Sequence, residues 1–121
     1  MAAYSAEKGG VMAQTEPTSD ILARLAAVIE DRRRASGDQS YTASLLEAGP
    51  ETCAEKLGEE SLETVIALVK GDKAAITHEA ADLLYHLMVA LAASGVGFEE
   101  VCRELERRTG QGGLEEKASR G

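Results

Sequence analysis

Hydrophobic residues recur at helical spacing near the start of the chain and predict a first helix over residues 20–36. Its apolar positions follow the pattern i, i+1, i+4, i+7 and i+8, which forms one stripe on a helix: Ile21, Leu22, Leu25, Val28 and Ile29. Ser19 is the expected N-cap, and Gly37 is expected to close the helix after the three arginines 32–34. These arginines are interpreted as a solvated last turn, with a site for an anionic ligand as the alternative.

Glycine and proline divide the rest of the chain into further helical stretches. Glycine favours the position after a helix, and proline favours the first helical turn. We expect four more helices, over residues 42–47, 51–70, 73–94 and 98–109. Strand signals are absent, because there is no alternating β-branched run and no Asn-Gly turn. The prediction is an all-α bundle of about four to five helices around a central antiparallel pair, completed by dimerisation.

Composition excludes several classes of function. The 121 residues carry 21 acidic and 13 basic side chains, a net charge of −8, which argues against a nucleic-acid binder. Aromatic residues are only 3%, too few for a base-stacking platform. No apolar run reaches the roughly 20 residues of a membrane span. Residues 1–17 lack the apolar segment of a signal peptide and predict a flexible tail, and Cys53 and Cys102 predict free thiols in a cytoplasmic protein.

Acidic residues gather in the middle of the chain, where residues 51–95 hold eight acids and only three bases. In the helix 51–70, Glu59, Glu60 and Glu63 share one arc with Lys56. Alone, this arc is typical of an ordinary solvated face.

The helix 73–94 changes that interpretation, because it is apolar nearly all round and therefore predicts a core helix. Glu79, Asp82 and His86 nevertheless form one stripe on it. Buried carboxylates are costly unless they are paired or bound to a cation, and the three nearby bases are too few to pair them. Residues equally far from the turn at Gly71 face each other in a helical hairpin, so Glu60 and Glu63 should meet Glu79 and Asp82 at the same depth.

We predict a metal site at these four carboxylates, Glu60, Glu63, Glu79 and Asp82. Oxygen ligands select hard cations, so Mg²⁺ is expected, with Mn²⁺ as a possible substitute. His86 is interpreted as a core or hydrogen-bonding residue rather than a ligand, and His78 as structural or exposed. Magnesium on carboxylates handles phosphate chains, and Glu59 is the candidate spare carboxylate that holds or deprotonates a water. A phosphate-binding P-loop motif is absent.

The residues resemble the all-α nucleoside-triphosphate pyrophosphohydrolase (MazG-like) superfamily, and within it the phosphoribosyl-ATP pyrophosphatase family. The likeness covers about residues 20–120 and rests on four stretches: Ser40-Tyr41-Thr42, Lys56 to Glu60, Glu79 to Leu87, and the ending Arg108-Thr109-Gly110 with Glu116 to Arg120. The carboxylate pairs alone are moderately specific, and their combination with the ending is highly specific.

This resemblance implies an enzyme of the second step of histidine biosynthesis, which hydrolyses 1-(5-phosphoribosyl)-ATP to 1-(5-phosphoribosyl)-AMP and pyrophosphate. It implies residues 18–121 as the pyrophosphohydrolase domain, acting as a homodimer or higher oligomer on a small nucleotide. Carried over by position, Glu60, Glu63, Glu79 and Asp82 hold the metal, and Glu59 is a further acidic ligand or orients water. The implied catalytic set is Glu59, Glu60 and Glu63, with Lys56, Lys117 and Arg120 as phosphate contacts.

Two alternatives remain open at this point. A housekeeping pyrophosphatase for noncanonical or deoxynucleotides would use the same four carboxylates. A non-enzymatic acidic helical module that binds a partner helix or divalent ions would tolerate the loss of one carboxylate. The residues that recognise adenine are also open, between aliphatic side chains and Tyr41.

Overall fold

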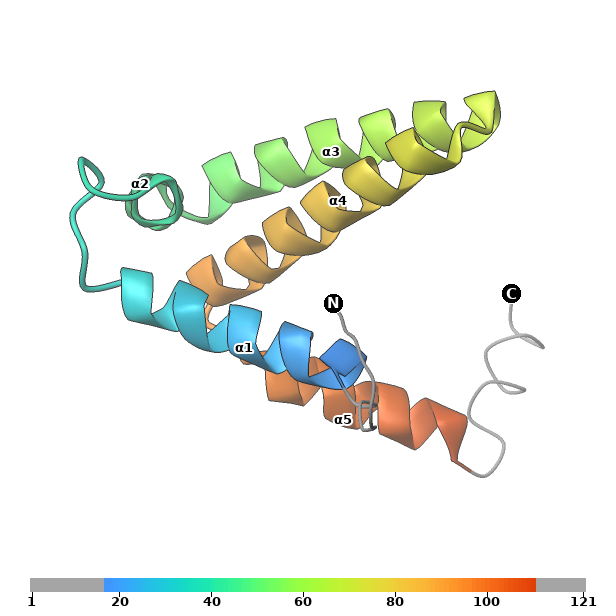
Figure 1. Ribbon diagram of the computed structural model, residues 1–121. Helices are drawn as coiled ribbons and strands as arrows, with labels where there is room; N and C mark the ends of the chain where they lie inside the picture. The colour runs from blue at the N-terminus through green and yellow to red at the C-terminus, as the bar shows by residue number, and fades with distance from the viewer. Residues whose placement is uncertain (1–16, 111–121) are drawn as a thin grey trace, which may run out of the picture.

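The computed structural model describes residues 17–110, which form five α-helices and no strand (Figure 1). The helices are α1 (Pro17–Arg32), α2 (Tyr41–Ala48), α3 (Pro50–Lys70), α4 (Lys73–Ala93) and α5 (Phe98–Thr109). The all-α prediction is confirmed for this part of the chain. Residues 1–16 and 111–121 lie outside the described residues, and with them most of the predicted tail and the candidate phosphate contacts Lys117 and Arg120.

The centre of the fold is the antiparallel hairpin of α3 and α4, the two longest helices. Gly71 ends α3 with a φ of 78°, in the left-handed region that suits glycine, and its N–H donates to the Ala67 carbonyl. Asp72 then caps α4, because its side chain accepts a hydrogen bond from the Ala74 N–H. Two residues thus reverse the chain, which holds the two long helices side by side as the sequence predicted.

The predicted first helix is displaced toward the N-terminus. It begins at Pro17 rather than after Ser19, since proline fits the first helical turn. It ends at Arg32 rather than at residue 36. The chain leaves it through tighter turns, in which the N–H groups of Arg33, Arg34 and Ala35 donate three residues back. The helical spacing therefore located the helix correctly but not its ends.

The short helix α2 lies across the open end of the hairpin, beside the start of α3 (Figure 1). Its N-cap is Ser40, whose hydroxyl accepts a hydrogen bond from the Ala43 N–H at 3.2 Å. Gly49, with a φ of 100°, separates it from α3, and Pro50 occupies the first turn of α3. This arrangement agrees with the predicted short segment and extends it by one residue at each end.

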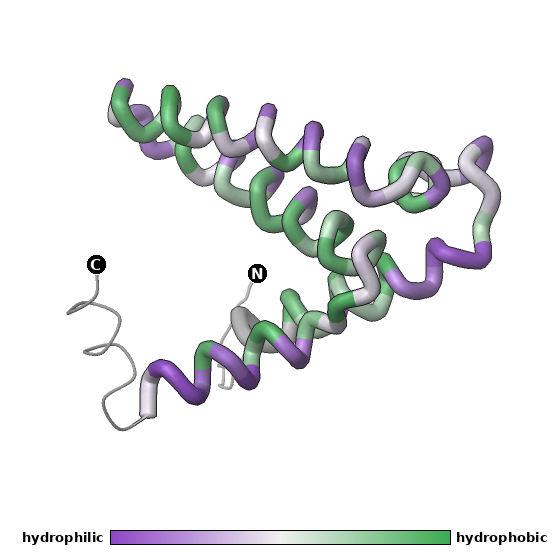
Figure 2. Tube along the Cα trace, turned by 180° about the vertical axis from the view of Figure 1, so that it is seen from behind, coloured by the Kyte–Doolittle hydropathy of each residue, from purple (hydrophilic) through white to green (hydrophobic). Residues whose placement is uncertain are grey.

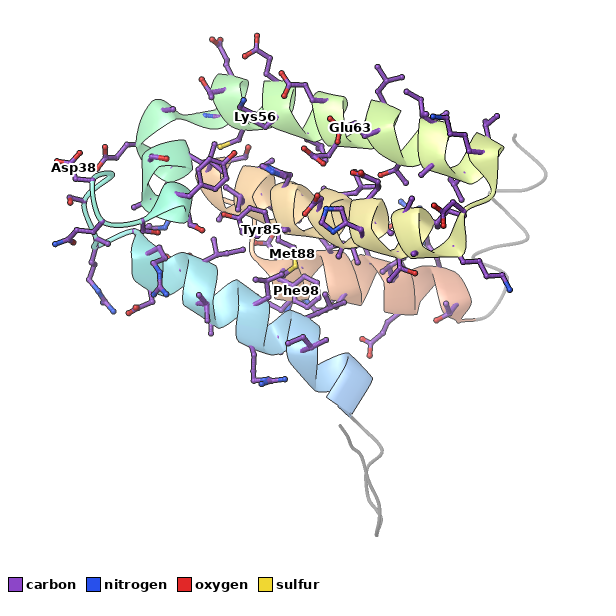
Figure 3. All side chains as sticks on the ribbon, turned by 45° about the horizontal axis from the view of Figure 1, so that its top comes forward. Asp38, Lys56, Glu63, Tyr85, Met88 and Phe98 are labelled. Atoms are coloured by element: carbon purple, nitrogen blue, oxygen red, sulfur yellow. The ribbon has the colours of Figure 1, made fainter. Side chains whose placement is uncertain are left out.

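The buried core lies at this same open end of the hairpin. Its side chains come from four helices and are Ile29, Leu45, Cys53, Met88 and Val89. Phe98 at the start of α5 packs against them, close to Met88 in Figure 3. The Cys53 thiol donates to the Leu45 carbonyl, and burial raises its pKa. Cys53 and Cys102 are both free, as predicted, but of the two thiols expected to be buried only Cys53 is, and Cys102 is partly exposed.

The outer face of α3 carries large apolar side chains that the rest of the described chain leaves exposed. Leu62, Val65, Ile66 and Val69 stand at i, i+3, i+4 and i+7, so they form one stripe. Val69 is 83% exposed. Figure 2 shows hydrophobic segments continuing to the tip of the hairpin, far from the core. We call these four residues the outer stripe.

No single helix among residues 17–110 has the length and hydrophobicity to cross a bilayer. The two helices α4 and α5 reach that threshold only when they are taken together across a bend of 111°.

Candidate metal centre

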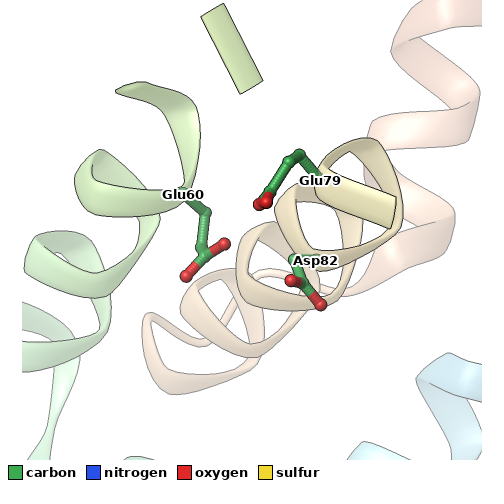
Figure 4. A group of neighbouring side chains, drawn as sticks. All are labelled: Glu60, Glu79 and Asp82. Atoms are coloured by element: carbon green, nitrogen blue, oxygen red, sulfur yellow. The ribbon is translucent and has the colours of Figure 1, made fainter. Parts of the chain in front are cut away.

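Three carboxylates from two helices converge between α3 and α4. Glu60 comes from α3, and Glu79 and Asp82 come from α4. One oxygen of each lies within 4.8 Å of the others, and Figure 4 shows all three side chains directed into the space between the helices. This separation is short enough for one cation to contact all three carboxylates.

The convergence follows from the hairpin register. Glu60 lies eleven residues before Gly71, and Asp82 lies eleven residues after it. The two positions are therefore at equal depth on neighbouring antiparallel helices. Ala67, one helical turn closer to the Gly71 turn than Glu63, is buried and small, so α3 and α4 can approach closely there. The predicted meeting of acids at the same depth is what the structure contains.

Glu63 lies beside this group rather than within it. Its carboxyl group is close enough to that of Glu79 to raise the pKa of Glu79, and its side chain is exposed. Figure 3 places Glu63 midway along α3. The structure therefore brings all four predicted ligands together, with three in a tight cluster and the fourth at its edge.

The electrostatics of the cluster are unfavourable without a cation. Burial raises the pKa of Glu79, the neighbouring Glu63 raises it further, and His78 partly opposes this. One carboxylate oxygen of Glu60 and one of Glu79 are buried without any hydrogen-bond partner. Such orphaned oxygens are rare in folded proteins and call for an explanation, of which a cation bound between them is one. No base among the described residues reaches these two atoms.

His78 is a neighbour of the cluster that the sequence interpretation missed. It is exposed, as expected, but its Nε2 lies 3.4 Å from a carboxylate oxygen of Asp82. The i, i+4 spacing of the two residues was the available signal.

The remaining predicted site residues on α3 sit at the solvent side. Lys56 Nζ lies 3.7 Å from a carboxylate oxygen of Glu59, and both side chains are about half exposed. Glu59 does not join the three-carboxylate group. The arginines at the end of α1 form ion pairs with acids of their own helix, as a solvated turn would. Arg33 differs from that interpretation, because it also donates a hydrogen bond to the Ala92 carbonyl on α4.

His86 is buried in an aromatic group between α2 and α4, which confirms the core position expected for it. Its ring packs edge-on against Tyr41 and Tyr85, at centroid distances of 6.2 and 5.0 Å. The Tyr85 hydroxyl is 2.5 Å from the Thr42 hydroxyl. Burial raises the pKa of Tyr85, against the smaller opposite effect of that hydrogen bond. This group closes the open end of the hairpin one turn from Asp82.

The donor set fits a hard divalent cation. All the side chains in the cluster offer carboxylate oxygens, which suit Mg²⁺ or Mn²⁺, and no cysteine or histidine is part of it. Fold and site together define a class of protein: an all-α protein with a carboxylate cluster, suited to a divalent cation, inside a helical hairpin.

Comparison with known proteins identifies the family within this class. Residues 22–109 match the family model described as phosphoribosyl-ATP pyrophosphohydrolase. The chain is 59% identical over 100 residues to the phosphoribosyl-ATP pyrophosphatase of Dinoroseobacter shibae, covering 83% of this chain and 98% of the relative. The relative from Paracoccus denitrificans, with the same name, is 53% identical over 109 residues, covering 90% and 99%. The chain belongs to the phosphoribosyl-ATP pyrophosphohydrolase family.

Proposed function

We propose that this chain hydrolyses 1-(5-phosphoribosyl)-ATP to 1-(5-phosphoribosyl)-AMP and pyrophosphate, the second step of histidine biosynthesis, in the cytoplasm and with Mg²⁺. The observation that carries the proposal is the cluster of Glu60, Glu79 and Asp82 within 4.8 Å, two of whose buried oxygens have no partner. Membership of the family supports the choice of substrate.

Glu60, Glu79 and Asp82 would hold the cation, and Glu63 would complete the set from the edge of the cluster. The bound cation would neutralise phosphate oxygens and acidify a water molecule. In the reaction water adds to phosphorus, the anhydride bond between the α- and β-phosphates breaks, and pyrophosphate leaves. We assign Glu59 to orient that water or accept its proton, since it lies one residue from Glu60 and outside the three-carboxylate group.

The phosphate chain also needs positive charge near this acidic surface. Lys56 lies one turn before Glu60 on α3 and is held by Glu59 at 3.7 Å. We assign it a phosphate contact, together with Lys117 and Arg120 beyond the described residues.

We further propose that the chain works as a homodimer formed through the outer stripe. Among the described residues, seven hydrophobic side chains are buried, whereas the outer stripe leaves four large ones open to water on one helix. Leu84 and Leu87 on α4 are also exposed. A second copy that covers such a face would bury this apolar surface and add to a small core.

The test is pyrophosphate release from phosphoribosyl-ATP by the full chain, with and without Mg²⁺. We expect release that requires Mg²⁺ and is faster than release from dCTP or dUTP at equal concentration. A preference for the deoxynucleotides would assign the chain to housekeeping hydrolysis instead. No release from any of the three would leave the acidic binding module as the better description.

A further inference from the structure

Thr64 makes a contact that joins the two halves of the carboxylate cluster. Its side chain is buried on α3, one helical turn after Glu60. The hydroxyl oxygen lies 2.8 Å from the backbone carbonyl oxygen of Glu60 and 3.1 Å from that of Glu79. The two carbonyls belong to different helices, and both belong to residues of the cluster.

Only the first of these contacts is usual for a helix. Threonine inside a helix commonly donates to the carbonyl four residues earlier, and that bond stays within its own helix. The contact with Glu79 crosses to α4. A hydroxyl has one proton to donate, so the two carbonyls share it in a three-centre bond. Thr64 therefore links the backbones of α3 and α4 at the depth of the cluster.

This link has a mechanical consequence for the acids. Within residues 17–110, Glu60 and Glu79 are the two residues whose carboxylates have buried oxygens without partners, and they face each other across the hairpin. Their negative charges repel, and in the absence of a cation this repulsion pushes the helices apart. A hydroxyl bonded to both carbonyls opposes that separation and fixes the two backbones from which the carboxylates project.

We propose that Thr64 is a positioning residue of the cation site, which keeps the carboxylates of Glu60 and Glu79 close enough to share one divalent ion. The proposal rests on the cation site of the proposed function. Groups that orient ligands in this way typically change metal affinity 10- to 100-fold when they are lost.

Three variants of the full chain separate positioning from packing. Thr64→Val keeps the size of the side chain and removes the hydroxyl, whereas Thr64→Ser keeps the hydroxyl. Ser61→Ala is the matched control, because the Ser61 hydroxyl on the same helix donates to Leu57 within α3, at 2.9 Å. Circular dichroism checks that each variant is helical. If Thr64→Val loses its helicity, Thr64→Cys, with a weaker donor, takes its place.

The primary readout is the dissociation constant of Mg²⁺ alone, measured by calorimetry, with Mn²⁺ binding followed by electron paramagnetic resonance. We expect Thr64→Val to raise this constant about tenfold, Thr64→Ser to stay within about twofold of wild type, and Ser61→Ala to change nothing. In the hydrolysis assay, the Mg²⁺ concentration for half-maximal rate should rise in Thr64→Val, while kcat at saturating Mg²⁺ is kept.

The outcomes distinguish the two proposals. A folded Thr64→Val protein that binds Mg²⁺ as tightly as wild type overturns the positioning role and leaves the proposed function standing. Equal weakening in Ser61→Ala also overturns it, because the effect would then belong to any helical hydroxyl. A wild-type chain that binds neither ion overturns the cation site itself.

Discussion

The open end of the α3–α4 hairpin and the middle of the hairpin bury different kinds of side chain. At the open end, Ile29, Met88 and Val89 belong to an apolar core of side chains from four helices, against which Phe98 of α5 packs. Halfway along, the space between the same two helices holds Glu60, Glu79 and Asp82 instead. The apolar core at the open end therefore stabilises the fold and offsets the repulsion between the like charges in the middle of the hairpin. The difference indicates that folding and chemistry can be altered separately in this small chain.

The first prediction addresses the core end and has the largest expected effect. Ile29→Ala should lower the free energy of unfolding by about 2–5 kcal/mol, because it opens a cavity at a side chain that is 2% exposed. Urea unfolding measures this change. The Mg²⁺ dissociation constant of the folded variant should stay within about twofold of wild type. A large change in metal affinity would mean that the core and the carboxylate cluster are coupled.

The second prediction addresses the carboxylate cluster in the middle of the hairpin. Asp82→Asn should slow pyrophosphate release from phosphoribosyl-ATP by at least about 100-fold, close to 2.7 kcal/mol of activation free energy, since it removes a proposed cation ligand. Glu63→Gln should have a similar effect. Helicity should be unchanged, and the melting temperature without metal should stay equal or rise, because repulsion is relieved.

Glu55→Gln is the control for these variants, since it neutralises an exposed acid of α3 that is outside the cluster. Its rate should equal that of wild type. Wild-type rates in both Asp82→Asn and Glu63→Gln would remove the enzymatic interpretation.

The third prediction concerns the outer stripe. Ile66→Glu should weaken self-association at least about tenfold, because a charge on this face has to be desolvated when a second copy covers it. Sedimentation equilibrium measures the effect. Leu105→Glu on α5 is the control, as Leu105 is similarly exposed but lies outside the stripe. Equal association of both variants and wild type would mean that the stripe is not the interface.

The fourth prediction concerns how stability and Mg²⁺ affinity depend on pH through the carboxylate cluster. The pKa of Glu79 is raised in the folded chain, so the folded protein takes up this proton at a higher pH than the unfolded chain does. The metal-free protein should therefore gain stability as the pH falls from neutral through the raised pKa, until both states are protonated. Mg²⁺ affinity should fall over the same range, because the ligand must be ionised.

Melting temperatures against pH, with a chelator and with saturating Mg²⁺, check both trends. Glu79→Gln should abolish the rise in the metal-free protein. The same rise in Glu79→Gln would assign it to another group.

The fifth prediction has the smallest effect and provides a surface reference for the buried acids. On α5, hydrogen bonds from Arg107 and Arg108 lower the pKa of Glu104 to about 2. Its contribution to stability is present above the ordinary value of 4.5 and is lost as the pH falls from there toward 2. Carboxyl NMR titration should show this low pKa. Glu104→Gln should change the melting temperature little, because the ion pairs are at the surface.

The hairpin could be predicted from the sequence because its signals are local and agree with one another. Gly71 ends one helix, Asp72 caps the next, and an almost entirely apolar α4 carries two acids on one stripe. Counting equal distances from the turn then brings the acids together without any knowledge of the rest of the fold. The helix α1 was predicted less well, since Pro17 and the tight turns after Arg32 offer several competing ends.

The finer arrangement of the site could not be predicted because it depends on how each helix rotates about its axis. The sequence treats Glu60 and Glu63 alike, yet Glu60 enters the three-carboxylate group and Glu63 remains at its edge. The bond from Thr64 to Glu79 has no pattern in the sequence, because it needs two residues fifteen positions apart to meet. The contact of His78 with Asp82, in contrast, does have a pattern in the sequence, because the two residues stand at the helical i, i+4 spacing.

The helix α3 faces a different neighbour on each side, and this limits how its sequence can change. Thr64 and Ala67 lie against α4, the acids of the cluster point into the proposed cation site, and the exposed outer stripe is the proposed dimer interface. Few positions between Glu59 and Val69 are then left to vary freely. In a library of single substitutions, tolerance along this helix should be concentrated at the exposed positions Glu51, Ala54 and Glu55 of its first two turns. An ordinary surface helix would tolerate change along one whole side.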